Sequence, residues 1–201
     1  VWLIAMAFIV NGYAQKFTTE QQTNYLIVTN KGGSALGYHA DSGVELLTVD
    51  GYAFKDLNKN GQLDNYEDWR LPVNERAEDL ASKMSIEQIA GLMLYSGHQS
   101  LPARPKGYFS GTYDGKPFKM GEIDPSDLTD QQKKFLSEDN LRHVLMTVVH
   151  SPEVAAKWNN KLQGFCEGIG LGIPANNSSD PRNGTTARAE YDAAAGGTIS
   201  M

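Results

Sequence analysis

The pattern of apolar and polar positions is most informative in the last third of the chain. Residues 143–149, HVLMTVV, form a continuous apolar run rich in β-branched residues, as in a strand buried on both faces. Ser151 and Pro152 suit the N-cap and first position of a helix that apolar spacing carries to Glu167. A second short strand is expected at residues 171–175. This order predicts an α/β fold with a parallel sheet and right-handed crossover; the pattern fits a (β/α) barrel and an open sheet equally well.

Helical spacing also marks residues 72–94, where apolar side chains recur on one face and charges fill the other. Capping boxes of the form Ser/Thr-x-x-Gln, at residues 85–88 and 129–132, predict the starts of two helices. Between them, residues 97–126 hold many prolines and glycines and few apolar repeats. This composition predicts a long surface loop bordering a site.

The first ten residues, VWLIAMAFIV, are apolar and carry no charge. This run is shorter than the roughly 20 residues of a membrane-spanning helix. It fits the hydrophobic region of a signal peptide covering residues 1–14, with Gly12 and Ala14 as the small residues before the cleavage point. A buried strand and a membrane anchor are the alternatives. The signal peptide predicts a periplasmic or secreted protein with no membrane span after cleavage.

Residues 15–70 are polar and rich in Gly, Thr and Gln, and they predict an irregular N-terminal segment. Two pieces, residues 25–29 and 44–49, alternate apolar and polar positions as strands do. His39 stands alone in a Gly-rich stretch, and we expect it to be a solvated loop residue.

The composition is that of an ordinary globular protein. Of 201 residues, 40% are hydrophobic, and 24 acidic against 18 basic side chains give a net charge of −6. An acidic balance without basic clusters argues against nucleic acid as a partner. The single cysteine, Cys166, excludes an internal disulfide framework and a Cys-rich zinc site. The sequence has no Gly-rich phosphate loop, and no organic cofactor is expected.

Residues 56–67, DLNKNGQLDNYE, match the calcium-loop pattern D-x-[DN]-x-[DN]-G-x5-E at every defined position. Calcium takes about six to eight oxygen ligands, and this spacing wraps oxygens round one point, with Gly61 at the sharp turn. The short run before the loop leaves little room for an entering helix, so a lone structural calcium loop is expected. The alternative is an Asn/Asp-rich turn without metal. The expected ligands are Asp56, Asn58, Asn60, the backbone carbonyl of Gln62, Asp64 and Glu67.

Two stretches carry a resemblance to a known family. The first reads DLNKNGQLDNYEDWRLPVNERAEDLASKMSIEQIAGLM, and the second reads HVLMTVVHSPEVAAKWNNKLQGFCEGIGLGIPANNSSDPRNG. Together they resemble the N-terminal part of glycoside hydrolase family 3, with most likeness to secreted β-glucosidase-like members of Bacteroidetes type, over residues 52–201. The more specific motif is a W-N segment followed by G-I-P and an Asp-x-x-x-Gly turn. It contains Trp158, Gln163, Gly172, Ile173, Pro174, Asp180 and Gly184.

The resemblance implies a truncated piece of a retaining β-glycosidase, with residues 71–201 as the first part of a (β/α) TIM-type barrel. It places Asp180 at the floor of a sugar pocket, where the carboxylate accepts hydrogen bonds from sugar hydroxyls. The alternative is that Asp180 only starts a turn. Arg182 either orients Asp180 or faces solvent. Asn183 stands where many family members carry His, which keeps a hydrogen bond but no ionisable group.

The same resemblance puts the nucleophile and the general acid in later polypeptide, so the fragment alone is expected to be inactive. The expected substrate of the parent is an oligosaccharide or β-glucoside with a terminal β-linked sugar. The sugar, the linkage, exo or endo action and the oligomeric state stay open. The rival interpretation is a non-catalytic, calcium-stabilised extracellular carbohydrate-binding module, or a pseudoenzyme that binds sugar.

Overall fold

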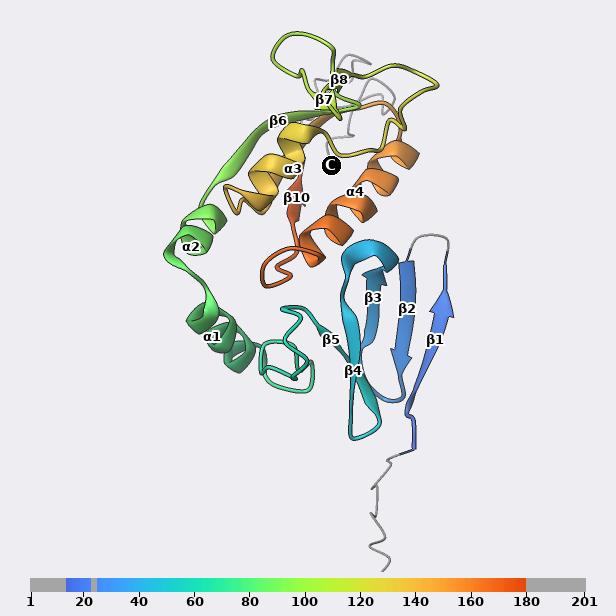
Figure 1. Ribbon diagram of the computed structural model, residues 1–201, viewed down its shortest axis with the longest axis vertical. Helices are drawn as coiled ribbons and strands as arrows, with labels where there is room; N and C mark the ends of the chain where they lie inside the picture. Colours follow the sequence, from blue (N-terminus) through green and yellow to red (C-terminus); the bar gives the residue numbers. More distant parts are fainter. Residues whose placement is uncertain (1–13, 23–24, 180–201) are drawn as a thin grey trace, which may run out of the picture.

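The structure is a computed structural model, and it describes residues 14–22 and 25–179. Two sheets from the N-terminal third lie beside the last long helix of a second region, which is built on a parallel sheet (Figure 1). Nearly all of the predicted signal peptide lies outside the described residues, as do the predicted sugar-binding residues Asp180, Arg182 and Asn183.

The N-terminal third forms two antiparallel sheets, so the prediction of an irregular segment over residues 15–70 is wrong. The strands predicted at 25–29 and 44–49 are present within a residue of their expected bounds, and three others were missed. The first sheet has the order β1-β2-β3, and β4 pairs with β5. The elements are β1 (Phe17–Gln21), β2 (Tyr25–Asn30), β3 (Ala35–His39), the short 3-10 helix η1 (Ala40–Ser42), β4 (Glu45–Val49) and β5 (Tyr52–Asp56).

Two side chains bind the backbone of Ala53 in β5, one from the other sheet and one from the segment after the predicted calcium loop. The buried Asn30 amide accepts a hydrogen bond from Ala53 N at 2.8 Å and donates to Ala53 O at 3.1 Å. Trp69, just after the predicted calcium loop, donates its indole N–H to Ala53 O at 3.0 Å and stacks on Phe54 at 5.3 Å. The end of the loop is therefore packed onto β5.

Helices α1 (Val73–Lys83) and α2 (Ile86–Leu92) confirm the helical region predicted over residues 72–94. Within the described part, α1 buries no residue, and Val73 is 74% exposed. The two helices follow one another along an edge of the molecule toward β6 (Figure 1). The apolar side chains recur on one face of these helices, as predicted, but little of the described chain packs against that face.

The second half forms a three-stranded parallel sheet in the order β10-β9-β6. Its crossovers run through α3 and α4, and a small hairpin of β7 and β8 lies in the first of them (Figure 1). The elements are β6 (Tyr95–Leu101), β7 (Thr112–Tyr113), β8 (Lys116–Pro117), α3 (Asp130–Ser137), β9 (His143–Val149), α4 (Pro152–Glu167) and β10 (Asn176–Ser178).

The sequence predicted β9 and α4 with their observed bounds, whereas two neighbouring predictions were wrong. The strand expected at residues 171–175 is β10, at Asn176–Ser178, because Gly170 and Gly172 adopt left-handed backbone with φ of 57° and 66° and turn the chain first. The loop expected over residues 97–126 begins only after β6, which pairs with β9 despite its glycine and polar residues.

A single apolar cluster lies where α3 and α4 cover this sheet. Trp158, Leu162 and Cys166 of α4 are fully buried in it, as the helical spacing predicts. The remaining buried members are Leu101, Leu128, Leu136, Leu141, Val144, Val154 and Ala175. Residues 14–22 and 25–179 do not close a barrel. No helix in these ranges has the length and apolar character needed to cross a bilayer.

Candidate functional site

The carboxyl ends of the three parallel strands point to the same edge of their sheet, because β6, β9 and β10 run in one direction. In α/β folds, ligand sites form at this edge. Asp180 follows Ser178, the last residue of β10, by two positions in the sequence. The structure therefore describes the strand that leads to Asp180, while the predicted contact of Asp180 with sugar stays a prediction.

Helix α4 holds the chain at β10 through two side-chain amides. Gln163 donates from Nε2 to Ala175 O at 2.9 Å and accepts from Ala175 N at Oε1 at 3.1 Å. One helical turn earlier, Asn159 accepts a hydrogen bond from the amide of Asn177. Residues four apart lie on one face of a helix, and residues two apart lie on one face of an extended chain. Asn159 and Gln163 therefore hold the same face of the segment that contains Ala175 and Asn177.

The other face of β10 meets polar side chains of β6 and β9. The Tyr95 hydroxyl is hydrogen-bonded to the Ser178 hydroxyl, and the Tyr95 ring stacks on His143 at 5.8 Å. His143 Nδ1 is hydrogen-bonded to the Asn176 amide at 3.1 Å. Sequence reasoning missed this cluster, because its members come from three strands and only pairing register brings them together.

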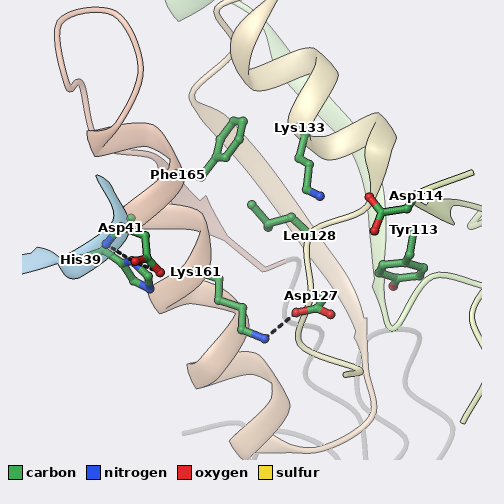
Figure 2. A pocket seen from close by; sticks show the side chains of 10 residues that line it. His39, Asp41, Tyr113, Asp114, Asp127, Leu128, Lys133, Lys161 and Phe165 are labelled. Carbon is green, nitrogen blue, oxygen red and sulfur yellow. Dashed lines mark hydrogen bonds and ion pairs between the residues drawn. The ribbon is translucent and has the colours of Figure 1, made fainter. Parts of the chain in front are cut away.

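A cavity of about 280 Å³ separates α4 from the loop before α3 (Figure 2). Lys161 of α4 forms ion pairs across it, at 2.6 Å with Asp127 and 3.0 Å with Asp124. The pKa of Asp124 falls to about 2, because the Ser126 backbone and side chain and Lys161 all donate hydrogen bonds to its carboxylate, which outweighs burial. The cavity is small and its charged side chains pair with one another, so we interpret it as a salt-bridged contact between α4 and the loop.

His39 is not a solvated loop residue, and that prediction is wrong. It ends β3, is half-buried, and its Nδ1 accepts a hydrogen bond from Asp41 N at 3.2 Å. Its backbone N–H donates to Glu167 Oε2 at 3.0 Å, and Glu167 also pairs with Lys55 of β5. A larger cleft of about 1080 Å³, partly lined by these residues, lies between the N-terminal strands and α4. The N-terminal sheets are thus tied to the end of α4.

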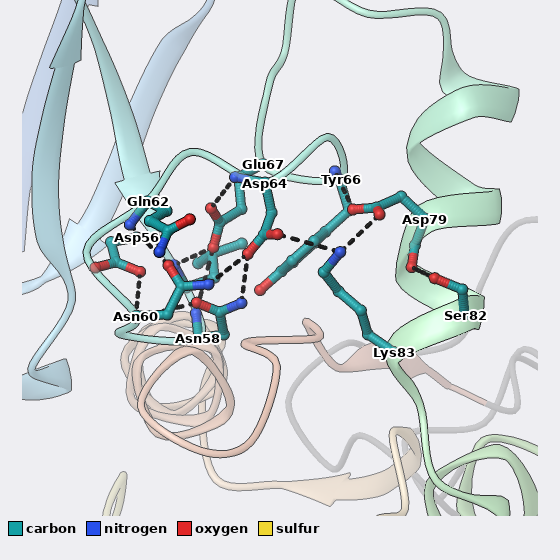
Figure 3. A network of polar contacts seen from close by, with 11 residues as sticks. Asp56, Asn58, Asn60, Gln62, Asp64, Tyr66, Glu67, Asp79, Ser82 and Lys83 are labelled. Atoms are coloured by element: carbon teal, nitrogen blue, oxygen red, sulfur yellow. Dashed lines mark hydrogen bonds and ion pairs between the residues drawn. The ribbon is translucent and has the colours of Figure 1, made fainter.

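The predicted calcium loop, residues 56–67, is compact and turns its polar side chains inward (Figure 3). Asp56 accepts hydrogen bonds from Asn60 N at 3.0 Å and Gly61 N at 2.8 Å. Asn58 Oδ1 accepts from Asn60 N at 3.1 Å, and Asn60 Oδ1 accepts from Gln62 N at 2.7 Å. Each of these oxygens keeps a second lone pair for a further partner.

The last position of the loop holds a buried carboxylate. Glu67 is 5% exposed and accepts backbone hydrogen bonds from Leu57 at 2.7 Å and from Asp64 at 3.0 Å. Burial nevertheless raises the pKa of Glu67, which means that its charge is not fully compensated. The Tyr66 hydroxyl is buried beside it, and burial followed by the Glu67 charge raises the pKa of Tyr66.

One cation of the chain already borders the loop. Lys83 of α1 lies 3.1 Å from Asp64 Oδ1 and 2.6 Å from Asp79 Oδ1. Burial by itself would raise the pKa of Asp64, but hydrogen bonds from Asn58, Lys83 and Asn60 outweigh it, so the pKa of Asp64 is lowered. Among the described residues, no group of three or more His, Cys, Asp or Glu side chains is arranged to hold a metal. Any cation in this loop therefore needs amide and backbone oxygens as well as carboxylates.

Comparison with known proteins gives one informative likeness. No family model matches the chain. A protein of Dickeya chrysanthemi described as "Periplasmic beta-glucosidase/beta-xylosidase" is 41% identical over 142 residues. These residues make up 70% of this chain and 19% of that relative, so the chain spans about a fifth of its length.

Proposed function

We propose that this chain is part of a longer retaining β-glycosidase that removes terminal β-linked sugar residues and works in the periplasm or outside the cell. The observation that carries the proposal is the 41% identity with a periplasmic beta-glucosidase/beta-xylosidase over most of the chain. Family 3 is the family we propose, on the motif residues around Trp158 and after Gly172. The printed location of the relative supports the periplasmic or secreted assignment.

The topology is compatible with this proposal. Successive parallel strands β6, β9 and β10 add at one edge of the sheet, which is the order that (β/α) barrels repeat round the closed sheet. A doubly wound sheet reverses this order at its ligand site. The three described strands would then be the first part of a barrel that later polypeptide completes, and the reacting carboxylates would come from that polypeptide.

The proposed contribution of this chain to the site is Asp180, as the acceptor of hydrogen bonds from sugar hydroxyls. Hydrogen bonds to an ionised acceptor are stronger than neutral ones, at roughly 1.5–3 kcal/mol each. Two such bonds lost from the transition state correspond to a fall in kcat/KM of about a hundredfold or more.

The test is hydrolysis of nitrophenyl β-glucoside and β-xyloside by the full-length polypeptide that contains this chain, beside its Asp180→Ala variant. Asp139→Ala is the matched control, because Asp139 is an exposed aspartate between α3 and β9. We expect turnover by the parent and the control and a large loss in the variant. Glycan binding without turnover would favour the carbohydrate-binding module, and unchanged turnover in Asp180→Ala would remove Asp180 from the site.

We also propose that the loop of residues 56–67 binds a structural calcium ion. The full match to the calcium-loop pattern supports this, together with the side-chain oxygens that Asp56, Asn58 and Asn60 turn toward the loop backbone and the buried carboxylate of Glu67, whose charge is only partly compensated. Because Trp69 packs directly behind the loop on β5, a bound ion would stabilise the N-terminal sheets.

Calorimetric titration of calcium into chelator-treated protein tests this site. We expect heat of binding and a higher melting temperature with calcium in the parent, and neither in Glu67→Gln. Glu75→Gln is the matched control, because this exposed glutamate lies in the first turn of α1, outside the loop. The absence of heat in the parent would remove the calcium proposal. It would leave the proposed glycosidase function standing.

A further inference from the structure

We propose that Gln163 is a positioning residue: its amide fixes the backbone at the start of β10 and so sets where the chain beyond this strand reaches the substrate. This role rests on the proposed glycosidase function, because Asp180 lies two residues after β10.

The contact is a two-point clamp on a single backbone unit. Gln163 Nε2 donates to Ala175 O at 2.9 Å, and its Oε1 accepts from Ala175 N at 3.1 Å. Both groups of Ala175 that a neighbouring strand would otherwise bind are therefore satisfied by a helix side chain. The backbone donor and acceptor also determine the orientation of the amide without ambiguity.

The strand after the clamp is short, and its other contacts come from β6, β9 and Asn159 of α4. β10 has three residues, and its ladder to β9 covers only those three. The chain reaches it through the left-handed turns at Gly170 and Gly172, which glycine leaves soft. Before β10, the guanidinium of Arg142 donates to Ile173 O at 2.9 Å, and Asn176 N donates to Arg142 O at 2.7 Å. The Gln163 clamp lies between these two contacts, on the helix side.

The surroundings of the clamp are polar and contain more cations than anions. Glu167, one turn further along α4, is paired with Lys55 of β5. The charged and titratable groups of the elements packed around Gln163 are Glu153, Lys157, Lys161, Cys166 and Glu167 on α4, Tyr25 on β2, Tyr38 and His39 on β3, Lys55 on β5, Arg76 on α1, Asp124 in the loop before α3, Arg142 just before β9 and His143 at its start.

A glutamate at this position makes the clamp switchable by pH. A protonated carboxyl presents one acceptor and one O–H donor, as the amide does, whereas the carboxylate has no donor and faces Ala175 O with negative charge. A free glutamate titrates near pH 4.3, so it is ionised at neutral pH. Gln163→Glu should therefore hold β10 correctly in acid and lose the clamp at neutral pH.

The experiment measures kcat/KM of the full-length enzyme on nitrophenyl β-glucoside from about pH 4.5 to about pH 8. The quantity compared at each pH is the kcat/KM of Gln163→Glu divided by the kcat/KM of wild type. A displacement of about 1 Å at a substrate contact costs up to a hundredfold, so we expect the ratio to fall tenfold to a hundredfold at the alkaline end and to return toward one in acid. Gln163→Met, which has no clamp at any pH, should stay low throughout.

Asn160→Asp is the matched control, because it adds a carboxylate to an exposed position of the same helix. Its ratio to wild type should stay flat. A flat ratio for Gln163→Glu, or one that follows Asn160→Asp, would overturn the clamp while wild-type turnover left the proposed function standing. An inactive wild type would overturn the proposed function itself. Melting temperatures of Gln163→Met and wild type check that a loss of activity is not a loss of folding.

Discussion

The buried pair of Gln132 and Trp158 gives the sharpest test of how the described core is held together. Gln132 is 1% exposed, and its Oε1 accepts hydrogen bonds from Trp158 Nε1 at 3.1 Å and from Thr129 N at 3.0 Å. Its Nε2 donates to Gln99 Oε1 at 3.1 Å. One amide thus joins α3, α4 and β6, and the perturbation is a double-mutant cycle of Gln132→Leu with Trp158→Phe.

The magnitudes follow from the groups left without partners. Gln132→Leu strands the indole N–H and the Thr129 N–H, at about 1–3 kcal/mol each, which gives a loss of about 2–6 kcal/mol in the free energy of unfolding. Trp158→Phe loses one net hydrogen bond of about 1 kcal/mol and leaves a void worth about 1 kcal/mol more. In the double variant the stranded indole N–H is absent. The Trp158–Gln132 hydrogen bond is also lost only once, so the destabilisation of the double variant should be about 2–4 kcal/mol less than the sum of the single changes.

Urea denaturation of the four proteins, followed by far-ultraviolet circular dichroism, measures these free energies without relying on tryptophan fluorescence. The slope against urea should stay constant across the set, so that midpoints report stability alone. Strictly additive effects would show that Trp158 and Gln132 are not coupled and would refute this account of the core.

Three further predictions concern the other contacts. Gly164→Ala should lower the melting temperature although Ala favours helices, because its Cβ would lie 2.6 Å from His39 Cβ; adding His39→Gly, which removes that Cβ, should recover part of the lost stability. Asp124→Asn should cost less than about 1 kcal/mol at neutral pH, since the carboxylate is half-exposed, and its difference from wild type should vanish between about pH 4 and about pH 2. Lys83→Met should tighten calcium binding in calorimetry, because the ammonium competes for Asp64.

The sign of the Asp124 prediction follows from its lowered pKa. The folded value of about 2 lies below the unfolded value near 3.9, so the carboxylate stabilises the fold above the unfolded value and loses this effect as pH falls through the folded one. A difference that grows in acid would contradict it. A Gly164→Ala protein as stable as wild type, or unchanged calcium affinity in Lys83→Met, would refute the other two predictions.

Elements coded by local signals were predictable. The apolar run of β9 has the observed bounds, and the Ser151 hydroxyl caps α4 by accepting from Val154 N at 3.2 Å. Both capping boxes form, as at Ser85, where side chain and backbone exchange hydrogen bonds with Gln88. These contacts span three or four residues, and no loop has to close before they form.

Strands without an apolar signature were not predictable. β1 reads FTTEQ and is largely exposed, so its sequence resembles a loop, and its strand character comes from pairing with β2. β10 reads NNS and is a strand through β9 and through the grip of α4. Whether such a segment forms a strand depends on the strands that pair with it. The pattern within a single segment carries no information on those partners.

The sequence by itself determined the local elements, the oxygen-rich loop of residues 56–67 and the likeness to a β-glycosidase. Only the tertiary structure decided that His39 meets Glu167, that Lys83 borders the loop, and that Gln163 holds Ala175. The physical reason is distance along the chain. The contact of His39 with Glu167 joins positions 128 residues apart. Such a contact forms only after packing has brought remote elements together, so no local pattern encodes it.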